Sequence, residues 1–264
     1  MTSIRQTIRS CGVTSILKAS CLASILAAVI WGCGGSLSEA PPPPPGAIPA
    51  GEAIGSASIG GRVSFRGTPP ERKPVNMTGE PSCARPGHGN LSEEVIVNAD
   101  GTLRNTFVRV VSGLGDRVFA PPAEPAEMNQ AGCVFAPHLL AVQSNQVIEF
   151  KSSDEILHNV RAEAESNRTF NVSMPGHGRT VRRFFSIPEM VTIRCDLHLW
   201  MRATIAVSGH PFFDVTGEDG RFDLTGLPAG TYDVEAWHEK YGTARETITL
   251  GEGEQVELEF EFGE

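Results

Sequence analysis

Residues 191–207 read VTIRCDLHLWMRATIAV, which is two β-rich runs joined by a short loop. Along the first run, Val191, Ile193 and Cys195 share one face, because side chains alternate with period two along a strand. The thiol of Cys195 is therefore predicted to point inward. A buried thiol is commonly an inert core group, so the role of this cysteine has to be inferred from the loop that follows it.

That loop brings three metal-binding groups close together in sequence. Cys195 supplies a thiolate, His198 an imidazole and Met201 a thioether, and His158 offers a second imidazole upstream. Two histidines and one cysteine in a plane, with a weak axial methionine, describe the blue-copper electron-transfer site. Each residue also has a plainer interpretation: His158 as a loop histidine bonded to the backbone, Met201 as a core filler. Their joint occurrence favours copper.

The sequence His158-Asn159-Val160 followed by a C-x-x-H-x-x-M loop resembles the cupredoxins, and the loop is similar to the short ligand loop of amicyanin. The resemblance implies a Greek-key β-sandwich holding type 1 copper, which alternates between Cu+ and Cu2+. In it, His158 would be the ligand from an earlier loop, Cys195 the thiolate, His198 the imidazole at the solvent edge and Met201 the axial thioether.

Two further positions bear on this resemblance. Asn159 matches an asparagine that braces the cysteine-bearing loop in the family. Leu199 stands where an amicyanin-type loop usually has proline, which affects the expected loop geometry and potential more than the ligation. An exposed patch of Leu199 and Trp200 would suit docking of a redox partner, since exposed apolar patches mark interaction sites. Alternatively, Trp200 packs against a second domain.

Most of the remaining chain is predicted to be β-structure. Strands are expected at Ile59–Phe65, at Glu94–Val97 and Thr106–Val111 around an Asn98–Gly101 turn, and from Leu139 onward. Phe119–Gly132 is rich in proline and alanine and is predicted to be a loop. The expected fold class is all-β, with a cupredoxin-like copper domain over residues 58–208.

After Val207 the pattern changes to short strands around tight turns. Asp219-Gly220-Arg221-Phe222 and the stretch from Leu227 to Tyr232 resemble the carboxypeptidase regulatory-like module, a transthyretin-like fold. We expect a second, small β-sandwich over residues 209–264. The fold relatives of this module include starch-binding-like sandwiches, which leaves open a carbohydrate-binding or surface role. Candidate stacking aromatics would be Tyr232, Trp237 and Tyr241.

The N-terminus has the parts of an export signal over residues 1–33. Positive residues precede an uncharged apolar stretch, Ala19–Trp31, that is short for a membrane span. Ile30-Trp31-Gly32-Cys33 resembles the bacterial lipoprotein signal, which implies lipidation at Cys33 and a location in the cell envelope. The alternative is ordinary cleavage and a soluble periplasmic protein. Residues 34–57 are predicted to be a linker, in which Pro41–Pro45 forms a semi-rigid spacer.

Removal of the signal leaves Cys83, Cys133 and Cys195 in the folded part. In an oxidising compartment two of three cysteines should pair, and Cys83 and Cys133 lie in turn-rich loops that suit a disulfide. A different use for them is a second metal site, formed by Cys133 and His138 with Cys83 or His88.

Charge and motifs narrow the function classes. The net charge is −9 and there is no Lys/Arg-rich run outside the export signal, so nucleic acid is not an expected partner. No nucleophile elbow, HExxH pair or phosphate-binding glycine loop occurs, and no enzyme is predicted. The leading expectation is a one-electron carrier serving a cytochrome, dehydrogenase or oxidase. The alternatives are copper storage or delivery, and carbohydrate binding.

Overall fold

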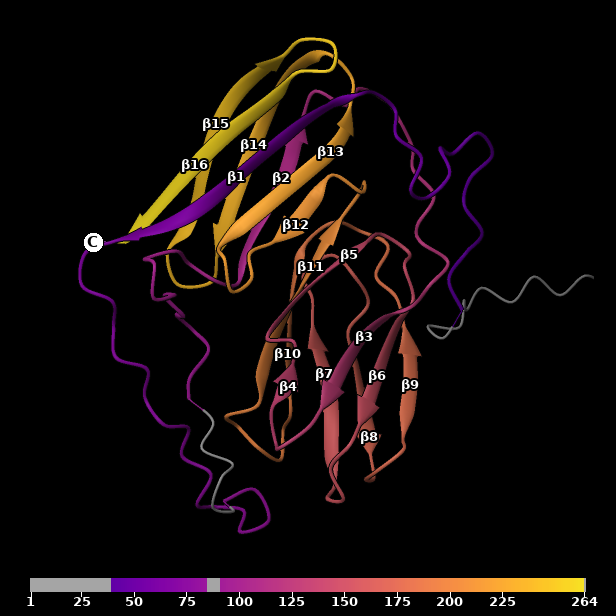
Figure 1. Ribbon diagram of the computed structural model, residues 1–264. Coiled ribbons are helices and arrows are strands. Elements are labelled where there is room, and N and C mark those ends of the chain that lie inside the picture. Colours follow the sequence, from indigo (N-terminus) through magenta and orange to yellow (C-terminus); the bar gives the residue numbers. More distant parts are fainter. Residues whose placement is uncertain (1–38, 85–90, 264) are drawn as a thin grey trace, which may run out of the picture. The chain divides into compact units, whose positions relative to one another are not determined.

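The computed structural model describes residues 39–84 and 91–263, and these are all-β. Within them, sixteen strands form four sheets, and no helix is long and apolar enough to cross a membrane (Figure 1). The predicted export signal and Cys33 lie outside the described residues. The sheets pack in pairs around two large hydrophobic cores, which gives two β-sandwiches.

The first sandwich contains the ligand loop predicted from the sequence. Its sheets have the orders β5-β11-β10-β7-β8 and β4-β3-β6-β9. The strands are β3 (Ala126–Gln130), β4 (Phe135–Ala136), β5 (Leu139–Gln143), β6 (Ile148–Ser152), β7 (His158–Glu163), β8 (Phe170–Met174), β9 (Thr180–Arg183), β10 (Met190–Arg194) and β11 (Arg202–Ser208).

Strand β10 lies between β7 and β11, antiparallel to both. Arg194 at its end pairs with Arg202 on one side and Arg161 on the other. Val191 and Ile193 are buried while Thr192 between them is exposed, so the predicted alternation holds. This register places the residue after β10 next to the start of β7.

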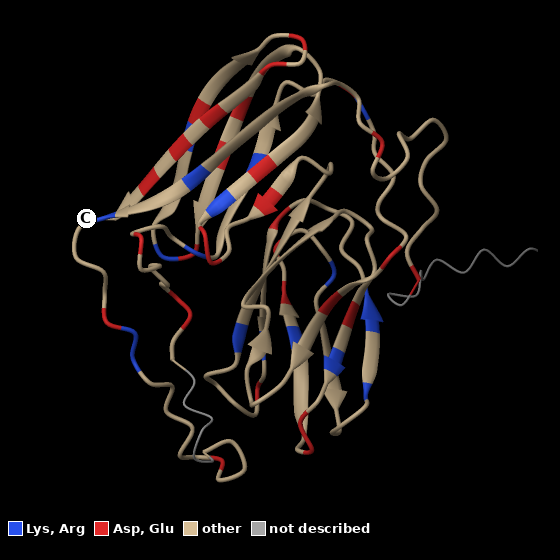
Figure 2. Cartoon of the chain, in the orientation of Figure 1, with Lys and Arg blue, Asp and Glu red and all other residues tan. Residues whose placement is uncertain are grey.

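The second sandwich has the sheets β13-β1-β16 and β12-β2-β14-β15. Arg62 and Arg66 of β1 pair with Glu259 and Glu261 of β16 at 3.2 and 3.3 Å, all with exposed side chains. The charged residues of β16, whose positions along the strand Figure 2 marks, therefore form a solvated face. The strands are β1 (Ala57–Arg66), β2 (Thr106–Ser112), β12 (Phe213–Val215), β13 (Arg221–Leu227), β14 (Gly230–His238), β15 (Gly242–Leu250) and β16 (Gln255–Gly263).

The pairing of β1 and β2 corrects the linear domain division at residue 208. Strand β1 lies between β13 and β16, and β2 lies between β12 and β14, so both complete the second sandwich. The sequence analysis included them in the predicted copper domain, residues 58–208, because they come before the ligand residues in the chain. Ile59 and Val63 of β1 are fully buried in the core of the second sandwich, which is the physical reason for the difference.

The predicted linker is also shorter than residues 34–57. Pro41–Pro45 are exposed, but Ile48 and Ile54 pack against the core of the second sandwich. The Ile48 amide donates to the Val118 carbonyl at 2.8 Å, and the Ile54 amide donates to the Gly226 carbonyl at 3.1 Å. The chain is thus fixed before β1 begins.

Two local predictions were wrong. The predicted loop Phe119–Gly132 contains β3, whose mostly polar sequence hides a strand with Met128 and Gln130 buried. Glu94–Val97 forms no strand; the expected hairpin is reduced to a bridge between Val97 and Leu103 across the Asn98–Gly101 turn.

Candidate metal centre

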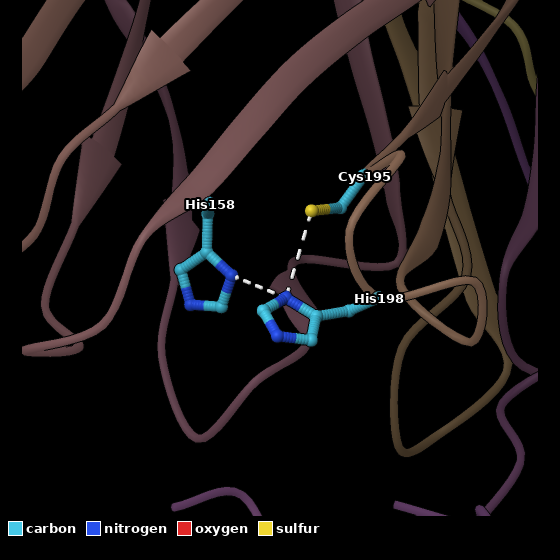
Figure 3. A group of neighbouring side chains, drawn as sticks. All are labelled: His158, Cys195 and His198. Carbon is cyan, nitrogen blue, oxygen red and sulfur yellow. Dashed lines mark hydrogen bonds between the residues drawn. The ribbon is translucent and has the colours of Figure 1, made fainter. Parts of the chain in front are cut away.

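Three of the predicted ligands converge in the first sandwich. His158 begins β7, Cys195 follows β10 and His198 lies in the loop between β10 and β11. Nδ1 of His158 is 2.9 Å from Nδ1 of His198, and Sγ of Cys195 is 3.6 Å from the same His198 nitrogen (Figure 3). The three ligand atoms all lie within 4.8 Å of one another, and the three side chains are buried.

The loop is closed by its own backbone. The Cys195 amide donates to the Met201 carbonyl at 3.2 Å, and the Met201 amide donates to the His198 carbonyl at 2.8 Å. Met201 is fully buried in the same core as Cys195. Met201, the fourth predicted ligand, thus closes the ligand loop through its backbone and is buried next to it in sequence.

Asn159 braces the cysteine-bearing loop. Its Oδ1 accepts from the Asp196 amide at 2.7 Å and from the Cys195 thiol at 3.2 Å. The backbone amide of Asn159 donates to the same sulfur at 3.5 Å. Its Nδ2 donates to Asn171 Oδ1 and Asp196 Oδ2 at 2.7 and 3.1 Å. The role implied for Asn159 by the family resemblance matches these contacts.

Asp154 fixes the orientation of His158 from the other side of the ring. Its Oδ2 lies 3.0 Å from His158 Nε2 and also accepts the Cys133 amide at 2.9 Å, while Oδ1 accepts the Gly132 amide at 2.7 Å. A carboxylate on Nε2 keeps a proton there and leaves Nδ1 free to face Cys195 and His198. Metal-binding histidines commonly have such a second partner.

The protonation of His158 and of Cys195 depends on these contacts. Burial opposes a charge on His158, but the hydrogen bonds that its ring donates to Asp154 and Cys195, together with their charges, outweigh burial and raise its pKa to about 9. Burial likewise opposes the Cys195 thiolate, yet His158 and neighbouring amides lower the pKa of that thiol. Metal ligands must be deprotonated, so His158 Nδ1 would have to be free of a proton to hold a metal here.

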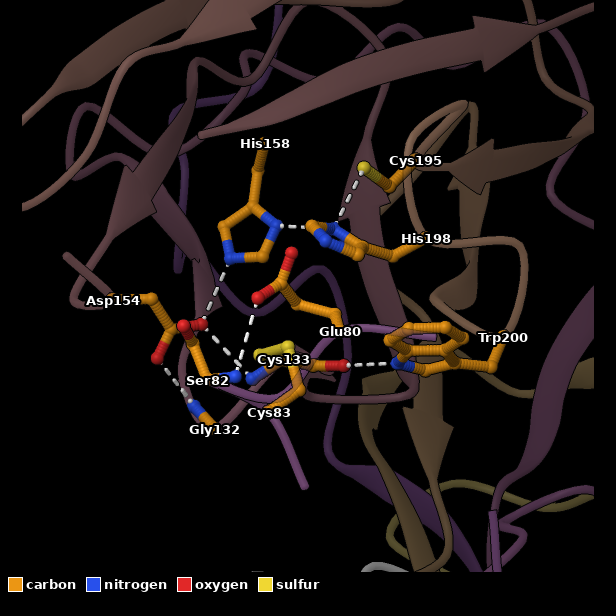
Figure 4. The surroundings of a disulfide bond; sticks show 10 residues. All are labelled: Glu80, Ser82, Cys83, Gly132, Cys133, Asp154, His158, Cys195, His198 and Trp200. Atoms are coloured by element: carbon orange, nitrogen blue, oxygen red, sulfur yellow. Dashed lines mark hydrogen bonds and ion pairs between the residues drawn. A yellow bond between two sulfur atoms is a disulfide. The ribbon is translucent and has the colours of Figure 1, made fainter. Parts of the chain in front are cut away.

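His198 is not at the solvent edge, and the expectation for this residue is corrected. Its side chain is only 5% exposed. The Trp200 ring lies 5.2 Å from the His198 ring, and Glu80 is near enough for its charge to act on both histidines (Figure 4). Burial and the charge of His158 together lower the pKa of His198.

The segment that carries Glu80 is held by a disulfide between Cys83 and Cys133. This bond realises the pairing predicted from the sequence and commits Cys133 to it. His138 pairs with Glu239 at 2.6 Å, whereas His88 lies outside the described residues. The alternative second site of Cys133 and His138 is therefore not formed among the described residues. Cys195 carries no disulfide.

The ligand loop also exposes apolar side chains. Leu199 and Leu197 are 75% and 54% exposed, so an apolar patch does lie next to the site. Trp200 is half-buried against the core of the first sandwich, and its Nε1 donates to the Cys133 carbonyl at 3.0 Å. Trp200 therefore holds the disulfide loop, a contact that neither of its two predicted roles included.

Sequence reading missed Asp154 and Glu80. An acidic residue four positions before His158 was a visible signal for Asp154, because a tight turn can return such a side chain to the ring. No local signal marks Glu80, which reaches the site from a segment distant in sequence through the disulfide.

The fold and this cluster define a class of protein with two β-sandwiches, one of which carries a buried His-Cys-His group. Residues 201–263 match the family model described as the carboxypeptidase regulatory-like domain, which confirms the resemblance of the C-terminal segment. No curated protein sequence matches the chain.

Similar solved structures include cupredoxins. A Cu-containing nitrite reductase (NirK) from Thermus scotoductus SA-01 is 22% identical over 39% of this chain and 26% of its own, with a TM-score of 0.32. The purple cupredoxin of Nitrosopumilus maritimus is 16% identical over 31% of this chain and 99% of its own, with a TM-score of 0.28. A Cu(I) amicyanin variant is 15% identical over 38% of this chain and 98% of its own, with a TM-score of 0.29.

Proposed function

We propose that the protein is an exported type 1 copper protein that carries one electron at a time. The observation that carries this proposal is the convergence of His158 Nδ1, His198 Nδ1 and Cys195 Sγ within 4.8 Å. Two imidazoles and a thiolate are a soft donor set that suits copper, and Met201, buried at the end of the same loop, would supply a thioether.

The chain's own residues hold this donor set in place. Asp154 orients His158, Asn159 positions the Cys195 sulfur, and two backbone hydrogen bonds close the loop at Met201. Bound copper would supply one-electron exchange between Cu+ and Cu2+. Ligands held by these bonds would rearrange little between the two oxidation states, so the barrier to electron transfer would be low.

Burial also favours a carrier over an enzyme. His158 and Cys195 are fully buried and His198 is 5% exposed, so a substrate molecule has little access to the ligands, whereas an electron needs none. The exposed leucines of the ligand loop, Leu197 and Leu199, offer an apolar contact for a protein partner such as a cytochrome, dehydrogenase or oxidase.

We place the protein in the cell envelope, anchored to a membrane through a lipid on Cys33. The basis is the signal-like sequence before Cys33 and the exposed Pro41–Pro45 spacer that follows it. A disulfide between Cys83 and Cys133 is consistent with an oxidising compartment. Radiolabelled lipid incorporation that is lost in Cys33→Ala would test the anchor.

The other function classes have less support. Copper delivery requires an exchangeable site, and His198 is covered. Carbohydrate binding requires an exposed aromatic surface, but Tyr232 is 1% exposed. Trp237 packs against the buried cluster of Phe107, Leu139 and Ala206. Tyr241 is in tilted ring contact with Phe65 and Phe262, so part of its ring is used in packing.

The test is the visible absorption of the protein loaded with cupric ion. We expect an intense blue thiolate-to-copper charge-transfer band that is absent in Cys195→Ser. Leu199→Ala, which changes an exposed residue of the same loop, should retain the band. A colourless protein that binds cuprous ion would favour storage or delivery, and absence of copper binding in both oxidation states would reject the proposal.

A further inference from the structure

A short segment, Asn76–Ala84, covers the His198 side of the site. Met77 and Cys83 of this segment are buried in the core that contains Cys195 and Met201, and Glu80 lies beside the two histidines (Figure 4). We call this segment the cover. His198 is only 5% exposed although it sits in a loop at the end of the sandwich, with Trp200 against its ring and Glu80 of the cover beside it.

The cover has few ties to the sandwich. Within the described part of the chain, each of its hydrogen bonds joins two of its own residues, as in Glu80 to Met77 at 3.0 Å and Cys83 to Glu80 at 2.9 Å. Attachment to the sandwich rests on apolar packing of Met77 and on the disulfide from Cys83 to Cys133. The disulfide is thus the strongest bond that keeps the cover in place.

Cys133 links this bond to both histidines. Its carbonyl accepts the Trp200 indole at 3.0 Å, and the Trp200 ring lies against His198. Its amide donates to Asp154 at 2.9 Å, and Asp154 holds His158 at 3.0 Å. Cys133 adopts a left-handed backbone with φ of 60°, which a non-glycine residue rarely keeps unless its surroundings impose it. The disulfide is part of those surroundings.

A pocket gives access to the disulfide. It has a volume of about 150 Å³ and is lined by Ser82, Cys83, Gly132, Cys133, Asp154 and neighbouring residues. The two cysteines are 1% and 3% exposed, so this pocket is the approach for a small thiol or a reductant's reactive sulfur.

We infer that the Cys83–Cys133 disulfide is a redox latch on the metal site. The oxidised form keeps the cover closed and retains copper, and the reduced form lets the cover move away from His198 and releases copper to an acceptor. This inference rests on the proposed copper site and deepens it. It makes one chain an electron carrier when the latch is closed and a copper donor when it is open.

The chemical step is thiol–disulfide exchange with a dithiol reductant. One thiolate of the dithiol attacks a sulfur of the pair, breaks the Cys83–Cys133 bond and forms a mixed disulfide. The second thiol of the reductant then displaces the remaining cysteine. Cys83 and Cys133 each end as a thiol, having gained two electrons and two protons together, and the reductant leaves as its own disulfide.

The experiment measures the rate at which Cu(I) passes from the loaded protein to a colorimetric Cu(I) chelator. One sample is kept oxidised. Another is reduced, freed of reductant under anaerobic conditions, shown by thiol titration to carry two additional thiols, and then loaded. The Cys83→Ala/Cys133→Ala double variant is treated in both ways, because it lacks the disulfide and cannot bind Cu(I) through those sulfurs. Carbethoxylation of His198 in the metal-free proteins reports whether the ring is exposed.

We expect copper loss on the order of 10- to 100-fold faster from the reduced protein, the range seen when outer-shell partners of a metal ligand are disturbed. The double variant should release copper at the same fast rate with and without reductant treatment. His198 should be modified faster in the reduced protein and in the double variant than in the oxidised protein. Reoxidation should restore slow release. Equal release rates from oxidised and reduced protein would overturn the latch alone. Absence of the blue band from a separate sample of the oxidised protein loaded with cupric ion would overturn the proposed function, and the latch with it.

Discussion

Oδ2 of Asp154 lies 3.0 Å from Nε2 of His158, on the far side of the ring from the nitrogen that faces Cys195 and His198. The carboxylate also accepts two backbone amides, those of Gly132 and Cys133. It therefore cannot turn away without breaking both of these hydrogen bonds. Asp154 connects the backbone of the disulfide loop to the proposed ligand His158, and its charge favours a proton on Nε2.

Asp154→Asn is predicted to weaken copper binding by about 10- to 100-fold while the fold is retained. The amide of asparagine can still accept one hydrogen bond, but its Nδ2 would face a backbone donor and the negative charge is lost. Competition against a chelator of known affinity measures the change. Glu155→Gln, at the exposed neighbouring position, is the matched control and should bind copper as the wild type does. Equal affinities in both variants would show that Asp154 does not act through His158.

Asn159→Ala is predicted to destabilise the metal-free protein by about 1–3 kcal/mol, because the buried Cys195 thiol and the part-buried Asp196 amide lose their shared acceptor. Cys195 keeps the backbone amide of residue 159 but loses the side-chain contact, so the blue band should also weaken or shift. Urea unfolding and the absorption spectrum measure the two effects. Asn171→Ala removes an exposed partner of Asn159 and should cost much less. A loss as large in Asn171→Ala would contradict the role given to Asn159.

Much of the fold and ligand set could be predicted because the signals are local. Strand alternation gave Cys195 an inward thiol, and the turns at Gly220 and after Leu227 indicated the second sandwich. The domain boundary could not be predicted in this way. Strand β1 pairs with β16 across nearly the whole chain, and no pattern within Ala57–Arg66 specifies that partner.

At the site, residue types predicted which side chains would meet but not what would cover them. The ligand loop and His158 carry a recognisable spacing, and the structure brings their donor atoms together. The burial of His198 depends on a segment positioned by a disulfide, and a pairing of Cys83 with Cys133 says nothing by itself about where Glu80 will lie. The burial of His198 and the position of Glu80 therefore depend on long-range packing, which local sequence patterns do not reveal.

Acid should destabilise the protein partly through His210 and His238. Burial lowers the pKa of each to about 4, from an ordinary value of 6.5. His210 uses both ring nitrogens when neutral, donating to the Val110 carbonyl at 2.8 Å and accepting the Phe212 amide at 3.2 Å. Below pH 6.5 the unfolded chain takes up protons that the folded one refuses until about pH 4, so stability falls as the pH falls through this window.

The loss from His210 is at most about 1.4 kcal/mol for each pH unit. His210→Gln should lower stability at pH 8, through weaker hydrogen bonding, yet show a shallower decline between pH 6.5 and pH 4.5 than the wild type. Urea unfolding across this pH range measures both slopes. Parallel slopes would mean that His210 is protonated in the folded protein and that its burial imposes no such penalty.

The second sandwich is predicted to need β1 and β2, although the family match covers residues 201–263 alone. Without these strands, β13 and β16 lose the strand between them, and β14 and β12 lose their shared neighbour. The buried side chains of Ile59, Val63 and Val108 would also leave the core. A fragment of residues 201–264 should therefore be unfolded, as seen by poor dispersion of its amide resonances.

Within the whole protein, Val63→Asp should produce the same local loss, because it places a carboxylate at a position with no solvent exposure. The neighbouring exposed residue supplies the control: Arg62→Asp changes the surface pairing with Glu259 and should leave the sandwich folded. The first sandwich has its own core, so the copper band should persist in Val63→Asp. A well-folded 201–264 fragment would show that the C-terminal strands fold on their own and that β1 and β2 are not required.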